Sequence, residues 1–327
     1  MTDAKLIEDL IEAFRRSKCM FTAAQLGVFD RTPATLAALA SDIGADPDAL
    51  ERLLCGCVSL GLLAREGDRF VNTAAAHKYL RRDSPDTMLG YILYSDRVLY
   101  PMWGNLADAV KEGANRWKQT FDLDGPIFAH FFQTPESRAE FLLGMHGFGV
   151  ISSPAVVRAF DLSRFQRFVD LGGATGHLAL AAVEAYAGMS AAVFDLPAVV
   201  EHARNFVGDH IDRIGGDFFT DPLPSADLYG LGRILHDWSE PKIRTLLRRI
   251  YDALPAGGAL LIAERLLQED KSGPTGALMQ SLNMLVCTEG KERTLGEYAA
   301  LLYDAGFTHV DGKWTGAPLD AILACKS

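Results

Sequence analysis

The 327-residue sequence has only five cysteines, and they are not arranged as a metal site. Cys55 and Cys57 form a C-x-C pair inside a helical pattern, where residues two apart point in different directions. A zinc site would need a second cluster of ligands, which the sequence lacks. We therefore expect free, buried thiols and no bound metal.

Long apolar runs are absent as well. No stretch reaches the 18 or so apolar residues of a membrane-spanning helix. The N-terminal segment MTDAKLIEDLIEAFRR is amphipathic and carries acidic side chains, which is typical of a docking helix rather than of a targeting peptide. These features predict a cytoplasmic protein with no membrane partner.

Acidic side chains outnumber basic ones, 42 to 32. The formal net charge is −10, and no basic patch or stripe of the kind that marks nucleic-acid-binding proteins is visible. We therefore expect no nucleic-acid partner.

Three segments differ in their patterns. Residues 1–110 have the three-and-four spacing of apolar residues that is typical of helices, and residues 111–160 form a helical connection broken by glycine and proline. Residues 161–327 alternate short apolar strands with amphipathic helices. This alternation predicts an α/β fold with a mostly parallel sheet covered on both faces. The tail segments FTHVDGKW and LDAILACKS are expected to add antiparallel strands.

The N-terminal segment contains a pattern resembling a winged helix. Asp46 is a candidate N-cap and Pro47 a first-turn proline of the second helix, and Gly67 marks a hairpin turn after it. In a DNA-binding interpretation this helix would contact phosphates, but its Arg52 is offset by neighbouring acids. A scaffold or dimerisation domain is the favoured interpretation.

Several strand ends carry groups suited to a cofactor. The first strand leads into Asp170 and the glycine loop Gly172, Gly173 and Gly176, whose residues allow close approach of a ligand. Ligands of open parallel sheets bind beyond the carboxyl ends of the strands. The loop does not match the G-x-G-x-x-G of dinucleotide binders. A carboxylate at Asp170 would repel phosphate but suits an ammonium group, as in S-adenosylmethionine.

The next two strands support the same interpretation. Asp195 ends the second strand, where it could accept hydrogen bonds from ribose hydroxyls. Asp217 and Phe218 end the third and offer a carboxylate and a ring for adenine. The alternative is that these acids only cap strand ends; their occurrence at three successive strand ends favours the cofactor.

A candidate general base follows the fourth strand. His236 lies in RILHDW, just past a strand end on the cofactor side of the sheet. A phenol has a pKa near 10 and is a poor nucleophile at pH 7, so a positioned imidazole would assist its attack on a methyl group. Such a base needs an orienting carboxylate, for which Glu264 and Glu292 are candidates. Either acid could instead be an ordinary solvated residue.

These residues lie in stretches that resemble the acetylserotonin (hydroxyindole) O-methyltransferases. The matching stretches include LGVFD, WGNLADAVKEG, VDLGGATG, VFDLP, GDFFTDPLPSADLY, RILHDW and QSLNMLVCTEGKERT, and they span nearly the whole chain in order. The resemblance implies a Rossmann-like class I methyltransferase domain with a seven-stranded sheet behind a winged-helix-like dimerisation domain. It also implies a homodimer.

The resemblance further implies roles for individual residues. The glycine loop and the strand-end residues would hold S-adenosylmethionine, His236 would be the general base, and Glu264 and Glu292 would flank it. The implied cofactor residues beyond the loop are Asp195, Leu196, Asp217, Phe218 and Arg233. The implied acceptor residues are Asp237, Asn283, Met279, Met145 and Phe148.

One stretch departs from the family pattern. The loop reads GGATG where these enzymes typically have GGGAG, so Ala174, Thr175 and the following His177 add side chains beside the expected methionine moiety. Alternatives to O-methylation therefore stay open. They are N-methylation, a non-methylating reaction on the same fold, and a non-catalytic dimeric ligand-binding protein.

Overall fold

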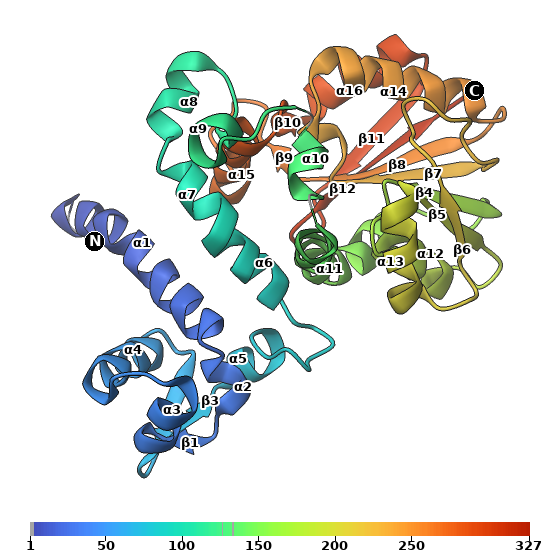
Figure 1. The fold of residues 1–327 in the computed structure, drawn as a ribbon. Coiled ribbons are helices and arrows are strands. Elements are labelled where there is room, and N and C mark those ends of the chain that lie inside the picture. Colours follow the sequence, from blue (N-terminus) through green and yellow to red (C-terminus); the bar gives the residue numbers. More distant parts are fainter. Residues whose placement is uncertain (1–2, 126, 133) are drawn as a thin grey trace. The chain divides into compact units, whose positions relative to one another are not determined.

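The computed structural model describes residues 3–125, 127–132 and 134–327, and the chain divides after Val98 into two compact units (Figure 1). The first unit is mainly helical with a small three-stranded sheet in the order β1-β3-β2. Its elements are α1 (Asp3–Gln25), α2 (Val28–Arg31), β1 (Ala34–Thr35), α3 (Leu36–Ile43), α4 (Pro47–Ser59), β2 (Leu63–Glu66), β3 (Arg69–Asn72), α5 (Ala74–Tyr79) and α6 (Leu89–Tyr94).

The predicted winged-helix pattern is confirmed in its local details. Asp46 caps α4, its side chain accepting a hydrogen bond from the Ala49 N–H at 2.9 Å, and Pro47 begins the helix. Gly67 turns between β2 and β3 with φ +62, which a glycine adopts without strain. The hairpin that follows α4 forms the wing.

The second unit begins with helices. A π-helical turn, Ser95–Leu99, leads into it. Its first helices are α7 (Tyr100–Trp103), α8 (Leu106–Glu112), α9 (Trp117–Phe121), α10 (Ile127–Phe131) and α11 (Pro135–Arg158). The sequence patterns predict a domain boundary near residue 110, whereas the structure divides the chain after Val98. The reason is that α7 and α8 pack against α15 (Thr275–Cys287) of the second unit.

The rest of this unit alternates strands and helices around one large sheet. The elements are β4 (Arg167–Leu171), α12 (His177–Ala185), β5 (Ser190–Asp195), α13 (Pro197–Val207), β6 (Asp212–Gly215), β7 (Leu228–Gly232), a 3₁₀ turn (Leu235–Asp237), α14 (Glu240–Ala253), β8 (Ala259–Glu264), β9 (Leu266–Leu267), α15, β10 (Arg293–Thr294), α16 (Leu295–Ala305), β11 (His309–Lys313) and β12 (Asp320–Cys325).

The sheet has seven strands in the order β11-β12-β8-β7-β4-β5-β6, as the family resemblance implied. The pairings from β8 to β6 are parallel. The tail strands β11 and β12 pair antiparallel, as predicted. Figure 1 shows α14 and α16 on one face of the sheet and α12 and α13 on the other. All six residues of β8 are buried, as expected for a strand covered on both sides.

The five cysteines differ in burial. All five cysteines are free, but only Cys57 and Cys287 are buried, so the prediction of buried thiols is wrong for the exposed Cys55.

Among the described residues, one helix, α11, is long and apolar enough to cross a membrane by length and composition. In the structure α11 packs against α12, and Leu142, Val156 and Val157 on it are buried.

Candidate active site

The candidate site lies at the carboxyl ends of the central strands. The chain starts the parallel sheet at β4, places β5 on one side of it and β7 on the other, and so creates a switch point between β4 and β7. Ligands of open α/β sheets bind at such points. The glycine loop follows β4 and the 3₁₀ turn with His236 follows β7, so the predicted cofactor and base residues come from adjacent strands.

The glycine loop has a backbone that most side chains would not permit. Gly172 and Gly176 have φ values of +67 and +76, in the left-handed region that favours glycine. A Cβ on Gly172 would lie 2.6 Å from the Ile234 side chain and 3.2 Å from the Phe218 ring. A Cβ on Gly173 would lie 2.7 Å from the carboxyl group of Asp170. The loop therefore lies directly against residues predicted for the cofactor.

Asp170 is buried at the base of this loop, with 1% of its surface exposed. Its Oδ2 atom is buried and has no hydrogen-bond partner among the described residues. Burial and, to a smaller extent, the charge of the nearby Asp195 raise the pKa of Asp170 to about 8. A buried carboxylate oxygen without a partner suits a cationic ligand, and the ammonium group of S-adenosylmethionine fits this requirement.

The other predicted cofactor acids hold backbone groups. Asp195 Oδ2 accepts the Ala174 N–H at 2.9 Å, and its Oδ1 accepts the Leu196 N–H at 2.7 Å. Asp195 thereby ties the end of β5 to the glycine loop. Asp217 Oδ1 accepts the Phe219 N–H at 2.8 Å, so this carboxylate also shapes the turn that presents Phe218.

Arg233 lies between the end of β7 and the 3₁₀ turn that carries His236. It has φ +58, which is uncommon for a residue with a side chain, and its N–H donates to the Ala263 carbonyl at 2.9 Å. Its guanidinium carbon lies 5.6 Å from the centre of the Phe148 ring on α11. Its charge also lowers the pKa values of Glu264 and Glu292 against the effect of burial.

His236 is buried together with both predicted carboxylates. His236 Nδ1 lies 2.7 Å from Glu292 Oε1 and 3.3 Å from Glu264 Oε2. His236 is 3% exposed, Glu292 1% and Glu264 0%. The alternative that either acid is a solvated surface residue is thus wrong. Both acids face the same ring nitrogen, which leaves Nε2 on the opposite side of the ring, 3.6 Å from Asp237 Oδ1.

The two glutamates have different surroundings. Glu264 Oε1 accepts the backbone N–H groups of Ile234, Leu235 and His236 at 3.1, 2.9 and 3.3 Å. Glu264 therefore holds the 3₁₀ turn in place. Glu292 makes the shorter contact to the ring, so it is the better candidate for fixing the tautomer of His236.

Three acids around the imidazole have raised pKa values. Burial raises the pKa of Glu292 to about 8 and those of Glu264 and Asp237 to about 7. When Glu292 is ionised, the proton on Nδ1 is donated to it and Nε2 has a free lone pair. When Glu292 is protonated, it donates to Nδ1 and Nε2 carries the hydrogen. Only the first arrangement can accept a proton from an acceptor hydroxyl.

Four of the five predicted acceptor residues lie on α11 and α15, and the fifth, Asp237, ends the 3₁₀ turn. Asn283 on α15 is 7% exposed, and its Oδ1 accepts the indole N–H of Trp103 at 2.8 Å. Met279, one turn earlier, is 46% exposed. Met145 and Phe148 on α11 are half-buried. Trp103 was not identified from the sequence, because nothing in its position in WGNLADAVKEG indicates a partner 180 residues away.

The buried triad also has the donor set of a metal site. His236, Glu264 and Glu292 each offer one ligand atom, and these atoms lie within 4.8 Å of one another. Glu292 Oε1 already lies in a short hydrogen bond with His236 Nδ1, and Glu264 Oε1 accepts three backbone N–H groups. Oε2 of each glutamate is buried and has no hydrogen-bond partner among the described residues.

The buried acids predict how stability depends on pH. The pKa values of Asp170 and Glu292 are raised to about 8, and those of Asp237 and Glu264 to about 7. In the unfolded chain these groups titrate near pH 4, so between pH 6.5 and 8 the folded state holds more protons. The free energy of unfolding should therefore fall as pH rises through this window. Burial lowers the pKa of His177 to about 3. This residue makes the free energy of unfolding rise with pH, but only below about pH 6.5, where the imidazole of the unfolded chain is protonated.

Urea unfolding at pH 6.5 and pH 8 measures this slope. Glu292→Gln and Asp170→Asn should each make it shallower, because each removes one group with a raised pKa. A free energy of unfolding that is constant or rises between these pH values would contradict the assignment of the buried acids.

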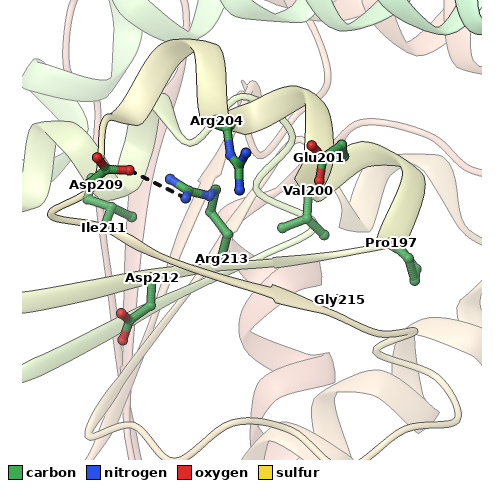
Figure 2. Close-up of a pocket in the computed structure, with 9 residues that line it drawn as sticks. All are labelled: Pro197, Val200, Glu201, Arg204, Asp209, Ile211, Asp212, Arg213 and Gly215. Carbon is green, nitrogen blue, oxygen red and sulfur yellow. Dashed lines mark ion pairs between the residues drawn. The ribbon is translucent and has the colours of Figure 1, made fainter.

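A separate open hollow of about 410 Å³ lies at the edge of the sheet, over α13 and β6 (Figure 2). Arginines and acids line it together, and Arg213 lies 3.7 Å from Asp209 across it. None of its lining residues is a predicted site residue. We therefore place the chemistry at the switch point and not in this hollow.

Comparison with protein families gives two matches. Residues 103–308 match the O-methyltransferase domain, and residues 8–82 match the O-methyltransferase dimerisation domain. The matched segments lie largely in the second and the first compact unit, respectively.

Individual relatives agree over the whole chain. The acetylserotonin O-methyltransferase of Bos taurus is 42% identical, with 98% of this chain and 97% of the relative covered. The crystal structure of human N-acetylserotonin methyltransferase in complex with SAM is 41% identical, with a TM-score of 0.95 and coverage of 100% and 99%. The N,N-8-amino-8-demethyl-D-riboflavin dimethyltransferase of Streptomyces davawensis is 27% identical, with a TM-score of 0.84 and full coverage of both chains.

Proposed function

We propose, from the premise that the chain belongs to the O-methyltransferase family, that it methylates a hydroxyl group of a small aromatic acceptor. S-adenosylmethionine is the methyl donor, and its sulfonium supplies an electrophilic methyl group. The acceptor class that the comparisons favour is a hydroxyindole, because the named relatives act on N-acetylserotonin. The observation that carries the proposal is the buried imidazole of His236, which follows β7 at the switch point and is held by Glu292.

His236 accepts the proton of the acceptor hydroxyl at Nε2. Glu292, 2.7 Å from Nδ1, orients the ring and stabilises the imidazolium that forms. General-base assistance of this kind is worth about 10²–10⁴-fold. Glu264 keeps the 3₁₀ turn and hence the ring in place. Asp237 and Asn283 would contact polar groups of the acceptor, and Met145, Phe148 and Met279 its apolar ring.

The glycine loop and its neighbours bind the donor. Asp170 would pair with the ammonium group, Asp195 with the ribose hydroxyls, and Asp217 and Phe218 with adenine. Leu196 and Arg233 complete this set. The donor brings an activated methyl group, so the reaction requires no metal ion.

The first unit supports a homodimer. Five apolar residues on α1 are 52–64% exposed in the single chain, and such a row is typical of an interaction surface. They are Leu6, Ile7, Leu10, Ile11 and Phe14. The free thiols of all five cysteines suit the reducing cytoplasm, where we propose that the protein acts.

N-methylation is the second candidate function. The riboflavin-derivative dimethyltransferase has the same fold at 27% identity, and by its name it methylates an amine. An amine acceptor has less need of a base as closely oriented as His236, because its nitrogen is already nucleophilic when neutral. The intact His236–Glu292 pair therefore favours a hydroxyl acceptor.

Mass spectrometry of products from a panel of hydroxylated and amino-substituted indoles and phenols tests the proposal. We expect one methyl ether and one S-adenosylhomocysteine per turnover with at least one hydroxyindole. Methylation confined to the amines would establish the second candidate instead. Calorimetry showing no binding of S-adenosylhomocysteine would favour a non-catalytic role.

Asp170→Asn should weaken S-adenosylhomocysteine binding by about ten- to hundredfold, because hydrogen bonds to charged groups are worth roughly 1.5–3 kcal/mol. The free variant should be no less stable than the wild type, since the change removes a buried acid. Calorimetry measures the affinity, and Asp212→Asn, an exposed acid at the start of β6, is the matched control. Equal affinity in both variants would remove Asp170 from the cofactor site.

A further inference from the structure

The departure of the glycine loop from the family pattern coincides with two hydrogen bonds to α11. Thr175 Oγ1 lies 2.9 Å from His146 Nδ1, and His177 Nδ1 lies 2.9 Å from Ser153 Oγ. Thr175 and Ser153 are 1% and 3% exposed. The two polar side chains that distinguish this loop therefore both contact one helix.

The residues of α11 that meet the loop form a single stripe. His146, Gly149 and Ser153 are spaced three and four residues apart, which places them on one face of the helix. A Cβ on Gly149 would lie 2.0 Å from the His177 ring, so only glycine lets this ring lie against the helix. This close approach is independent evidence that the helix and the loop fit each other here.

Both imidazoles are held in their neutral form. Burial lowers the pKa of His146. Burial, with smaller effects of His146 and Arg233, lowers the pKa of His177 to about 3. The His146 ring also packs on Phe206 of α13, with ring centres 4.5 Å apart. The hydroxyls of Thr175 and Ser153 thus each pair with a buried imidazole, and the ring of His146 is also held by Phe206.

The neighbouring stripe of α11 carries two candidate acceptor residues. Met145 directly precedes His146, and Phe148 directly precedes Gly149. The Phe148 ring lies under the guanidinium of Arg233. A shift of α11 relative to the loop would therefore move Met145 and Phe148 relative to the cofactor residues.

We propose that Thr175 and His177 are positioning residues that hold α11 against the glycine loop. Cofactor binding to the loop would thereby also order α11, which carries the candidate acceptor residues Met145 and Phe148. This inference rests on the proposed function, because it assumes that the loop binds S-adenosylmethionine. Ordering of the loop by the ligand would be transmitted to α11 through the two hydroxyl–imidazole pairs. The acceptor would then bind next to α11 after cofactor binding has ordered this helix.

Hydrogen exchange with and without S-adenosylhomocysteine tests whether ordering of the glycine loop also orders α11. In the wild type, the ligand should slow amide exchange both in the loop and in α11 around residues 142–153. In Thr175→Val, which keeps the side-chain shape, the loop should still respond while the response of α11 is reduced. Ligand affinity should fall by about 2- to 12-fold, as expected for the loss of one hydrogen bond. Ser153→Ala should likewise reduce the exchange response of α11 and the ligand affinity.

Two variants separate positioning from simple packing. Thr175→Ser keeps the hydroxyl and should restore the response of α11. Ser152→Ala removes a hydroxyl that donates only to the Phe148 carbonyl within α11, and should respond like the wild type. Wild-type responses of α11 in both Thr175→Val and Ser153→Ala would overturn the inference while leaving the proposed function intact. Absence of ligand binding by the wild type would instead overturn the proposed function and this inference with it.

Discussion

Replacing His236 with alanine should lower turnover by about 10²–10⁴-fold while leaving the affinity for S-adenosylhomocysteine unchanged. The loss is expected because a phenol is largely protonated at pH 7 and reacts slowly without a base to accept its proton. The affinity should persist because the glycine loop, Asp170 and Asp195 are built on β4 and β5, apart from the turn that carries His236. Steady-state kinetics and calorimetry measure the two quantities.

The control is His309→Ala, which removes an exposed imidazole on the edge strand β11. It should leave both turnover and affinity unchanged. Wild-type turnover in His236→Ala would remove this residue from the mechanism. A parallel loss of cofactor affinity would indicate that the turn, and not the base, had been damaged.

Glu292→Gln should reduce turnover by about 10²-fold or more with little change in shape. The carboxylate of Glu292 accepts the Nδ1 hydrogen of His236, whereas a glutamine amide can donate to Nδ1 and stabilise the tautomer that has its hydrogen on Nε2. That tautomer cannot act as the base. Replacement of the acid that orients a catalytic histidine has effects of this kind in serine proteases.

The pH profile provides a second test of Glu292. Because the pKa of this residue is raised to about 8, the wild-type rate should rise with pH through that region. The variant should lose this dependence. Glu289→Gln, three residues earlier and paired with Lys242 on the surface, is the matched control and should keep the wild-type profile. An unchanged profile in Glu292→Gln would mean that another group sets the tautomer.

Much of the catalytic unit could be predicted from the sequence, because local patterns determine it. The apolar strands ending in glycine or acid, followed by amphipathic helices, require a parallel sheet, and the ends of such strands meet at one edge. Asp170, Asp195 and His236 could therefore be assigned to one site from their positions at strand ends. The seven strands and the antiparallel pairings of the tail are confirmed.

Contacts between distant segments could not be predicted in this way. Glu292 is 56 residues from His236, and its charged surroundings in EGKERT are equally typical of a solvated loop. Only the packed structure shows that it is buried against Nδ1 and that Glu264 instead holds the backbone. The same holds for Trp103, whose indole reaches Asn283 from another helix.

The domain boundary illustrates a different limit. Helical periodicity continues through residues 99–112, so the sequence offered no break before about residue 110. The structure divides the chain earlier, because α7 and α8 contribute their packing surfaces to α15. Periodicity reveals that a helix is amphipathic, but not which body covers its apolar face.

The most direct test of the proposed mechanism compares two acceptors of similar shape. One is a phenol with a pKa near 10, and the other carries an electron-withdrawing group that leaves it mostly ionised at the assay pH. Single-turnover methyl transfer is measured for the wild type and His236→Ala with each. If His236 removes the proton, the variant should lose about 10²–10⁴-fold with the first acceptor and almost nothing with the second. An equal loss with both acceptors would contradict a general-base role for His236.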